Sequence, residues 1–184
     1  MKAATELVCD RGYTATGVDA ICAKAGVAKT ALYWHFGNKA GLVAAVVDEL
    51  CQSWVDAIAA QVAASGTPFE RLDQLLVGLR DIVENRAHLL AVVQVVVNEA
   101  AHLDEAVVDA IRRLDDAALG AIAEGFREVV EEVPDADLIG VTVIALLHEI
   151  HRRRSLYGDA VDLDRYFADM RQTIIASVAA RFRD

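Results

Sequence analysis

The chain has 184 residues, of which 55% are hydrophobic and two are proline, and its formal net charge is −10. This composition excludes a disordered or collagen-like chain and favours one or two helix-rich globular domains. No apolar stretch typical of a signal peptide follows Met1, and the longest apolar runs, 89–97 and 138–147, are too short to cross a bilayer, so we expect a soluble, cytoplasmic protein.

Glycine, proline and capping residues divide the chain into about nine predicted helices. The first helix covers 2–11, the second is capped by Thr16 and ends near Ala25, and the third covers 28–36. The fourth covers 39–62 and is capped by Asn38, and the next three cover 68–85, 87–99 and 104–132. The eighth is capped by Asp135 and ends at Tyr157, and the last is capped by Asp162 or Asp164. Thr67-Pro68-Phe69-Glu70 is a capping box with proline at the first helical position. The strand-like run 92–97 has no hairpin partner and is interpreted as a buried helix. The prediction is an all-α fold, with a three-helix head and a larger helical bundle.

The helices at 18–25 and 28–36 are short and joined by a glycine turn, which gives them the dimensions of a helix-turn-helix. A small core is predicted from Leu7, Val8, Ile21, Cys22, Val27, Ala31 and Leu32, with Phe36 also interior. The outer face then carries Lys29, Thr30, Tyr33, Trp34 and His35. Polar, aromatic and cationic side chains of this kind contact base edges and phosphates when a helix enters the major groove.

The acidic charge of the chain is unevenly distributed. Residues 1–50 carry five basic and five acidic side chains, whereas the remainder carries 13 basic and 23 acidic ones. No acid lies between Ala20 and Val47, a segment that contains Lys24, Lys29 and Lys39. This distribution favours a chain that binds DNA with its N-terminal end only.

The segments 11–16, 21–27 and 29–39 carry the most specific pattern in the chain, above all Leu32-Tyr33-Trp34-His35-Phe36 followed by Lys39. Over roughly residues 3–50 this pattern resembles the DNA-binding domain of the TetR family. The resemblance implies a homodimeric regulator without enzymatic activity or cofactor. It also implies a helix-turn-helix domain at 1–46, with its motif at about 17–36, and a ligand-binding and dimerisation domain at 47–184.

The resemblance also implies roles for single residues. Lys29, Thr30 and Trp34 match groove contacts on the recognition helix, and Tyr33 and His35 match phosphate contacts. Thr16 and Gly17 match the point where the second helix meets the DNA backbone. Lys39, at the start of the fourth helix, matches a phosphate-holding lysine, which agrees with the anion affinity of helix N-termini.

The chain departs from the family pattern at several positions. Ala28 replaces the usual Ser or Thr cap, which costs about 1 kcal/mol of local stability. Gly17 and Ala31 stand where hydroxyl residues are common, and Asp19 stands where a basic or polar residue is usual, so it is expected to weaken DNA binding or to select sequence. The family commonly has a longer first helix, so the head either makes fewer phosphate contacts or has a start upstream of Met1.

The predicted body contains two helices suited to a subunit interface. The eighth helix is apolar on nearly every side between 138 and 147, and the last helix carries an apolar stripe at helical spacing. A four-helix interface is therefore predicted from Leu138, Val141, Ala145, Phe167, Met170, Ile174 and Val178, with an ordinary core as the alternative.

The remaining helices are predicted to enclose a small-molecule effector. The run 89–97 is apolar except for Gln94, which fits an apolar ligand with one polar anchor or, equally, a packed core. Trp54, Asn98 and His102 are weaker lining candidates. His148 and His151 share a helix face as metal ligands do, but the following Arg152-Arg153-Arg154 favours a salt-bridged helix end.

The chain has an odd number of cysteines, Cys9, Cys22 and Cys51, and their spacing is not that of metal ligands. We therefore expect small buried hydrophobic side chains rather than a disulfide or zinc site, with a Cys9–Cys22 redox pair as the alternative.

The leading hypothesis for the whole chain is a repressor released from a palindromic operator by a largely apolar ligand. A TetR-like activator or a ligand-independent regulator is the alternative. A helical ligand carrier or enzyme is disfavoured, because no catalytic set stands out.

Overall fold

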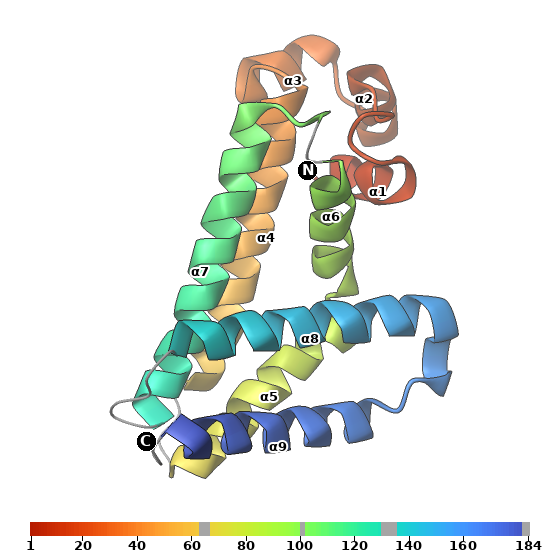
Figure 1. The fold of residues 1–184 in the computed structure, drawn as a ribbon. Helices are drawn as coiled ribbons and strands as arrows, with labels where there is room; N and C mark the ends of the chain where they lie inside the picture. The colour runs from red at the N-terminus through yellow and green to blue at the C-terminus, as the bar shows by residue number, and fades with distance from the viewer. Residues whose placement is uncertain (63–66, 100–101, 130–135, 182–184) are drawn as a thin grey trace. The chain divides into compact units, whose positions relative to one another are not determined.

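Helices make up almost all regular structure in the computed structural model, which describes residues 1–62, 67–99, 102–129 and 136–181 (Figure 1). The described part contains nine α-helices, a short 3-10 helix, and no strand, so the predicted all-α fold is confirmed. The helices fall into two compact units, Met1–Ser53 with His88–Asp116 and Trp54–Ala87 with Ala117–Asp184. The predicted division of the chain at residue 46 stays a prediction.

The first unit begins with three short helices. We call these three helices and the start of the fourth helix the head. They are α1 (Lys2–Arg11), α2 (Val18–Ala25) and α3 (Lys29–Phe36), followed by α4 (Lys39–Val62), of which the part up to Ser53 belongs to this unit. The unit is completed by α6 (Ala87–Asn98) and by the N-terminal half of α7 (Glu105–Val129). The strand-like run 92–97 lies within α6, as predicted.

A side-chain cap marks the start of α4 but not the starts of α1, α2 and α3. The side-chain oxygen of Asn38 accepts a hydrogen bond of 2.7 Å from Gly41 N, which caps α4 as predicted. Ala28 stands at the N-cap of α3 without a side-chain bond, also as predicted. The prediction that Thr16 caps α2 is wrong, because Gly17 is the N-cap. The Thr16 side chain is buried and its hydroxyl donates to the carbonyls of Leu7 and Gly12, so it ties α1 to the following loop instead.

The core of the head is smaller than predicted. Leu7, Val8, Ile21, Cys22 and Leu32 are all buried, as expected. Val27 is 48% exposed and Ala31 is also exposed, so neither closes the core of the isolated chain. Phe36 is half-buried. The two exposed residues line a shallow apolar hollow together with Leu32 and Phe36.

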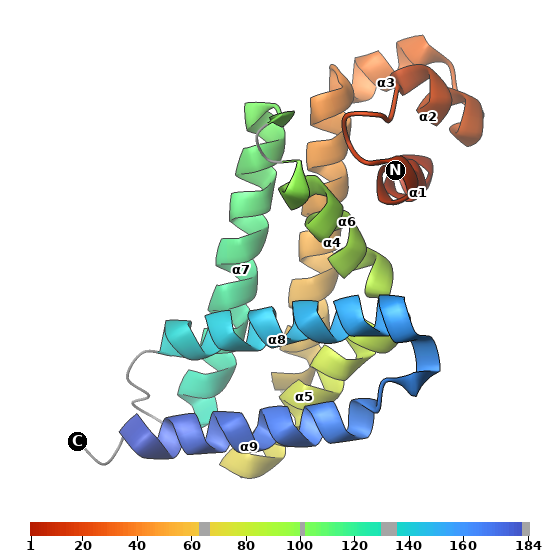
Figure 2. The same cartoon turned by 45° about the vertical axis from the view of Figure 1, so that its right-hand side comes forward.

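The second unit packs three helices with the remaining parts of α4 and α7. They are α5 (Pro68–Asn85), α8 (Ala136–Tyr157) and α9 (Leu163–Arg181), with the 3-10 helix η2 (Gly158–Ala160) between the last two. Figure 2 shows α8 and α9 as an antiparallel pair joined through η2. The capping box is confirmed, since Glu70 N donates to Thr67 Oγ1 and Thr67 N donates to Glu70 Oε2. The predicted cap Asp135 lies outside the described residues.

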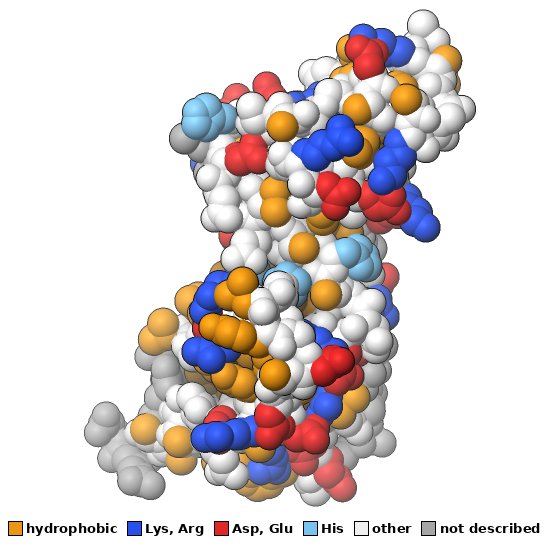
Figure 3. All heavy atoms as spheres, turned by 90° about the vertical axis from the view of Figure 1, so that its right-hand side faces the viewer, with side chains coloured by type: hydrophobic (Ala, Val, Ile, Leu, Met, Phe, Trp, Pro, Cys, Tyr) orange, Lys and Arg blue, Asp and Glu red, His pale blue; other side chains and the backbone are white. Residues whose placement is uncertain are grey.

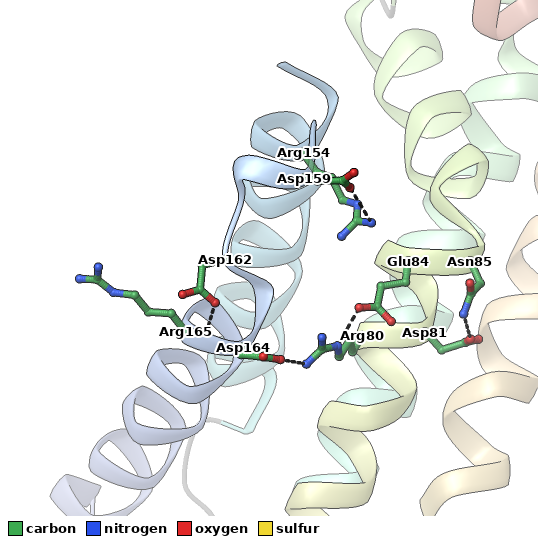
Figure 4. A network of polar contacts seen from close by, with 9 residues as sticks. All are labelled: Arg80, Asp81, Glu84, Asn85, Arg154, Asp159, Asp162, Asp164 and Arg165. Atoms are coloured by element: carbon green, nitrogen blue, oxygen red, sulfur yellow. Dashed lines mark hydrogen bonds and ion pairs between the residues drawn. The ribbon is translucent and has the colours of Figure 1, made fainter. Parts of the chain in front are cut away.

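Ion pairs join α5 to α9 along the outside of this unit. Arg80 donates to Glu84 on its own helix and to Asp164 in the first turn of α9, at 2.9 and 2.5 Å (Figure 4). Farther along, Arg171 Nε donates to Asp73 at 2.5 Å. Asp162 is the cap of α9, because its carboxylate accepts from Arg165 N, while the Arg165 side chain points away from the network. Such exposed pairs fix register more than they add stability.

The apolar stripe of α9 faces the interior of its own subunit. Phe167, Met170 and Ile174 are only 7%, 2% and 4% exposed, and Val178 is half-buried. This burial within one chain favours the ordinary-core alternative for the first three, and the subunit interface on α8 and α9 stays a prediction. On α8, by contrast, Leu138 and Val141 are 56% and 48% exposed. No helix among the described residues is both long and apolar enough to cross a membrane.

Candidate nucleic-acid interface

The turn between α2 and α3 fixes the geometry of the candidate interface. Gly26 ends α2 in the left-handed region, with φ 68° and ψ 29°, and Val27 N donates to the Cys22 carbonyl. Buried Ile21 and Leu32 then pack the two helices together. The result is a short helix pair whose second member, α3, buries Leu32 and leaves most of its other side chains exposed.

The exposed face of α3 carries an unusual amount of aromatic surface. Trp34 is 81% exposed and Tyr33 is 43% exposed. His35 is exposed as well, and its ring meets the Trp34 ring edge-on, with 4.7 Å between ring centroids. Lys29 and Thr30, in the first turn of α3, are also exposed. The five side chains predicted for the outer face are thus all accessible, and their contacts with DNA remain a prediction.

The lysines of the acid-free segment are engaged with other groups of the head. Lys24 pairs with Glu6, and Lys29 pairs with Asp19, both at 2.8 Å. The hydrogen bond from Lys24 lowers the pKa of Glu6, and the bond to Asp19 raises the pKa of Lys29. On the face drawn in Figure 3, basic and acidic side chains accordingly adjoin one another over the head. The head therefore presents less free positive charge than its sequence indicates.

Two predicted backbone-contacting residues differ in accessibility. Gly17 is exposed at the N-cap of α2, where free amides point outward. Thr16 is 1% exposed and its hydroxyl is already bonded, so its side chain cannot reach a phosphate in this conformation. Lys39 is half-buried, and its ammonium donates to the Tyr13 carbonyl at 2.8 Å and lies 4.1 Å from the centroid of the Tyr13 ring.

Beneath the helix pair, two acids from the α6–α7 region hold the loop between α1 and α2. Glu99, directly after α6, accepts from Tyr13 N at 3.0 Å and from Thr14 N at 2.7 Å. Asp104, directly before α7, accepts from the Tyr13 hydroxyl. Thr14, Tyr13 N–H and Lys39 together lower the pKa of Glu99, with Thr14 as the largest cause. Burial, followed by Asp104, raises the pKa of the Tyr13 hydroxyl.

The sequence reasoning did not find these two acids. They lie more than 80 positions after the loop they hold, and a sequence pattern carries no sign of that pairing. The one local signal is Gly12, whose φ of 86° and ψ of 167° only glycine adopts readily. A Cβ at this position would overlap the Glu99 carboxylate. The glycine thus does more than end α1, since it also makes room for the acid.

The predicted effector-binding residues are divided between the two units. Gln94 is half-buried on α6, and Asn98 and His102 are exposed, all in the first unit. Trp54 belongs to the second unit, where it is 7% exposed and its indole Nε1 has no hydrogen-bond partner within the part of the chain that the structure describes. Whether any of the four contacts a ligand stays a prediction.

The sequence reasoning also missed two buried polar atoms of the second unit. Gln74 Oε1 and His151 Nδ1 are buried and lack a hydrogen-bond partner among the described residues. Burial, and then the charge of His148, lower the pKa of His151, which favours the neutral imidazole. Buried polar atoms are nearly always paired, so unpaired ones mark positions where a ligand or water is expected.

The predicted salt-bridged end of α8 is partly confirmed. Glu149 accepts from both Arg152 and Arg153, and these bonds lower its pKa to about 2. His151, however, is 6% exposed and belongs to the interior rather than to the solvated face. No group of three potential metal ligands is found in the described part of the chain.

The cysteines differ in environment. Cys22 is buried, whereas Cys9 and Cys51 are half-buried, so the prediction of buried thiols holds fully only for Cys22. Burial is the main cause that raises the pKa of Cys9 and of Cys51. A raised pKa disfavours the reactive thiolate, which argues against the alternative of a Cys9–Cys22 redox pair.

Comparison with known proteins adds independent findings. Residues 1–46 match the sequence profile described as "Bacterial regulatory proteins, tetR family". The chain is 34% identical over 83 residues to the HTH-type transcriptional activator FasR of Mycolicibacterium smegmatis, a match that spans 45% of this chain and 38% of FasR.

Solved structures show the same fold over nearly the whole chain. The fatty acid degradation regulator FadR of Bacillus halodurans superposes with a TM-score of 0.76 at 21% identity, covering 94% of each chain. FadR of Bacillus subtilis, solved with stearoyl-CoA, gives 0.77 at 17% identity and 96% of each chain. A TetR-like regulator from Rhodococcus sp. RHA1 gives 0.71 at 23% identity, covering 97% of this chain and 92% of that one.

Proposed function

We propose that this chain, as a member of the TetR family of bacterial regulatory proteins, is a transcriptional regulator. It binds a palindromic operator as a homodimer and leaves the operator when a largely apolar effector binds. The exposed face of α3 is the observation that carries this proposal. A tryptophan that is 81% exposed contributes nothing to the core of the isolated chain. Such a side chain on the second helix of a helix-turn-helix is explained by contact with a DNA groove.

The face of α8 supports the dimer. Leu138, Val141 and Ala145 are exposed and follow one another at helical spacing, so they form an apolar strip on this helix. A second copy of the same strip is the simplest cover, because a two-fold dimer places two heads on the two halves of a palindrome. The expected test is Leu138→Glu, which should yield monomers in analytical ultracentrifugation. Thr173→Ala, an exposed change on α9, should remain dimeric.

The unpaired polar atoms of the second unit support an effector with both apolar and polar parts. An indole N–H at Trp54 requires an acceptor, and Gln74 Oε1 requires a donor. Apart from His151, the other buried side chains among the described residues of this unit are apolar, which suits an aliphatic chain. The fold is shared with two fatty-acid regulators, so fatty acyl compounds are the first effectors to test. The name of the FasR relative favours transcriptional activation as the second candidate for the sign of regulation.

The test of DNA binding is selection of genomic fragments by the purified protein at two salt concentrations. We expect one palindromic site whose affinity falls as salt rises. Trp34→Ala should abolish enrichment of that site, whereas Phe69→Ala, which removes a 60% exposed aromatic from α5, should not. Recovery of no specific site by the wild-type chain would refute the proposal. Equal enrichment by both variants would show that α3 is not the reading helix.

The sign of regulation is tested by transcription in vitro from the selected site. A repressor lowers the transcript and an acyl effector restores it, whereas an activator raises the transcript. An unchanged response to acyl compounds, with DNA binding intact, would contradict the effector proposed for the second unit while leaving the DNA-binding proposal standing.

A further inference from the structure

The head has a base that joins the two ends of its helix-turn-helix. Tyr13 lies before α2, and Lys39 lies after α3 as the first residue of α4. The Lys39 ammonium donates to the Tyr13 carbonyl and also lies over the Tyr13 ring, which is 3% exposed. We call Tyr13, Thr14 and Lys39 the head base. Because it bridges the residues on both sides of α2 and α3, any movement of the base tilts both helices together.

Two carboxylates attach the head base to the α6–α7 region, and we call Glu99 and Asp104 the clamp acids. They contact the base at three points, two backbone N–H groups and one phenolic hydroxyl. The division of the chain into compact units agrees, since His88–Asp116 groups with Met1–Ser53. The orientation of the head within the first unit is therefore held at the clamp acids.

The position of Glu99 in its own helix makes this attachment informative. A carboxylate directly after a helix faces the negative end of the helix dipole, which is locally unfavourable. At Glu99 that cost is offset by the two loop N–H groups, and the neighbouring Lys39 adds a favourable charge. The loop is also shaped for the carboxylate, because Gly12 has no Cβ and a Cβ at this position would overlap the Glu99 side chain. Both the loop and the end of α6 therefore contribute to this pairing.

We infer that Glu99 is a positioning residue: its carboxylate sets the orientation of the recognition helix through the head base, and so the operator spacing that a dimer accepts. This inference rests on the proposed function, because its effect is measured through DNA binding. In this inference Glu99 itself does not contact DNA. Its loss should leave every DNA-contacting side chain in place while allowing the head to tilt. A tilt of two rigid heads alters the distance between them, which a palindrome with fixed half-site spacing detects.

The first arm of the experiment needs no DNA. Hydrogen–deuterium exchange of the full-length Glu99→Gln variant should show at least tenfold faster exchange at the amides of Tyr13 and Thr14. A glutamine accepts through only one oxygen, so one of the two amides loses its partner. The matched control is Glu105→Gln, which removes the same charge from an exposed position in the first turn of α7. In Glu105→Gln the amides of Tyr13 and Thr14 should exchange at the wild-type rate.

The second arm measures DNA affinity on operators whose half-site spacing is changed in single base-pair steps. The wild type and Glu105→Gln should prefer one spacing sharply, and Glu99→Gln should bind neighbouring spacings with affinities within a few-fold of the best one. A residue with a merely structural role would lower stability without altering the preferred spacing. Tyr13→Phe, which keeps the buried ring and removes the bond to Asp104, provides a second variant if Glu99→Gln folds poorly.

Outcomes of the two arms separate the inference from the proposed function. Wild-type exchange rates in Glu99→Gln, or an unchanged spacing profile with faster exchange, would overturn the inference. Failure of the wild-type chain to bind any operator would overturn the proposed function, and with it the role in spacing. Faster exchange together with a broadened spacing profile would support both.

Discussion

Replacing Gly12 by alanine tests the close packing of the loop against Glu99. The residue has φ 86° and ψ 167°, a region that is essentially restricted to glycine and costs other residues about 1–3 kcal/mol. The added Cβ would also overlap the carboxylate, which must then leave its two N–H partners. Charge-assisted bonds of this kind are strong when buried, but this group is partly exposed, so we take about 1–2 kcal/mol for the pair.

The expected loss in free energy of unfolding is therefore about 2–5 kcal/mol, which corresponds to a fall in Tm of roughly 5–15 °C for a chain of this size. Two matched substitutions separate the causes. Gly26→Ala places a Cβ at φ 68° with no atom within 4 Å, so it should cost only the backbone strain of about 1–2 kcal/mol. Gly120→Ala, within α7 and equally unobstructed, should stabilise by about 0.5–1 kcal/mol.

The assay is urea unfolding followed by circular dichroism, with the double variant Gly12→Ala/Glu99→Ala completing a cycle. If the carboxylate is the obstacle, Gly12→Ala should cost clearly less when Glu99 is already absent. A cost for Gly12→Ala equal to that of Gly26→Ala, or strict additivity in the cycle, would refute the reasoning and leave only a backbone requirement at this turn.

Three further changes have defined outcomes. Asp19→Asn frees Lys29 and removes an acid beside α3, so DNA affinity measured by fluorescence anisotropy should rise several-fold. The slope of log affinity against log salt concentration should steepen by about 1. Unchanged affinity would place Asp19 outside the interface. Thr67→Ala should lower stability to urea by about 1 kcal/mol through loss of the capping box, with Thr173→Ala as a near-neutral control. The lowered pKa of Glu99 means that its contribution to stability is complete above the ordinary value near pH 4.3 and is lost as pH falls through the lower folded value. Exchange protection at Thr14 should follow that loss, whereas Glu99→Gln should show no such pH dependence.

Local signals account for what the sequence predicted correctly. The bounds of α1, α4 and α5 agree with the prediction because glycine, Asn38 and the capping box act over a few residues. Thr16 was misjudged by the same local logic, since a hydroxyl just before a helix usually caps it. Here the hydroxyl donates to the carbonyls of Leu7 and Gly12, and these bonds hold the side chain toward the end of α1, so that its oxygen does not cap α2. This arrangement becomes visible only when α1 is folded against the loop.

Periodicity identified the buried side of α9 but not what buries it. An apolar stripe has the same spacing whether it packs against α5 and α8 of its own chain or against a partner subunit. Phe167, Met170 and Ile174 are covered internally, whereas Leu138 and Val141 on α8 are not. Likewise, a count of charges along 20–47 indicated a basic surface, but Asp19, just outside that window, and Glu6, on α1, pair with two of its three lysines.

The paired lysines and the clamp acids together explain how an acidic chain can carry a DNA-binding head. Because Lys24 and Lys29 are engaged and Lys39 is held at Tyr13, we expect weak nonspecific attraction to phosphates and a discrimination between DNA sequences that depends more on shape than on charge. Shape discrimination requires a head of defined orientation, which is what Glu99 and Asp104 provide within the first unit. A chain with free lysines would bind DNA well even with a loosely held head. The present chain should depend on its clamp acids, so we expect Glu99→Gln to lower its specificity among operators more than its affinity for DNA.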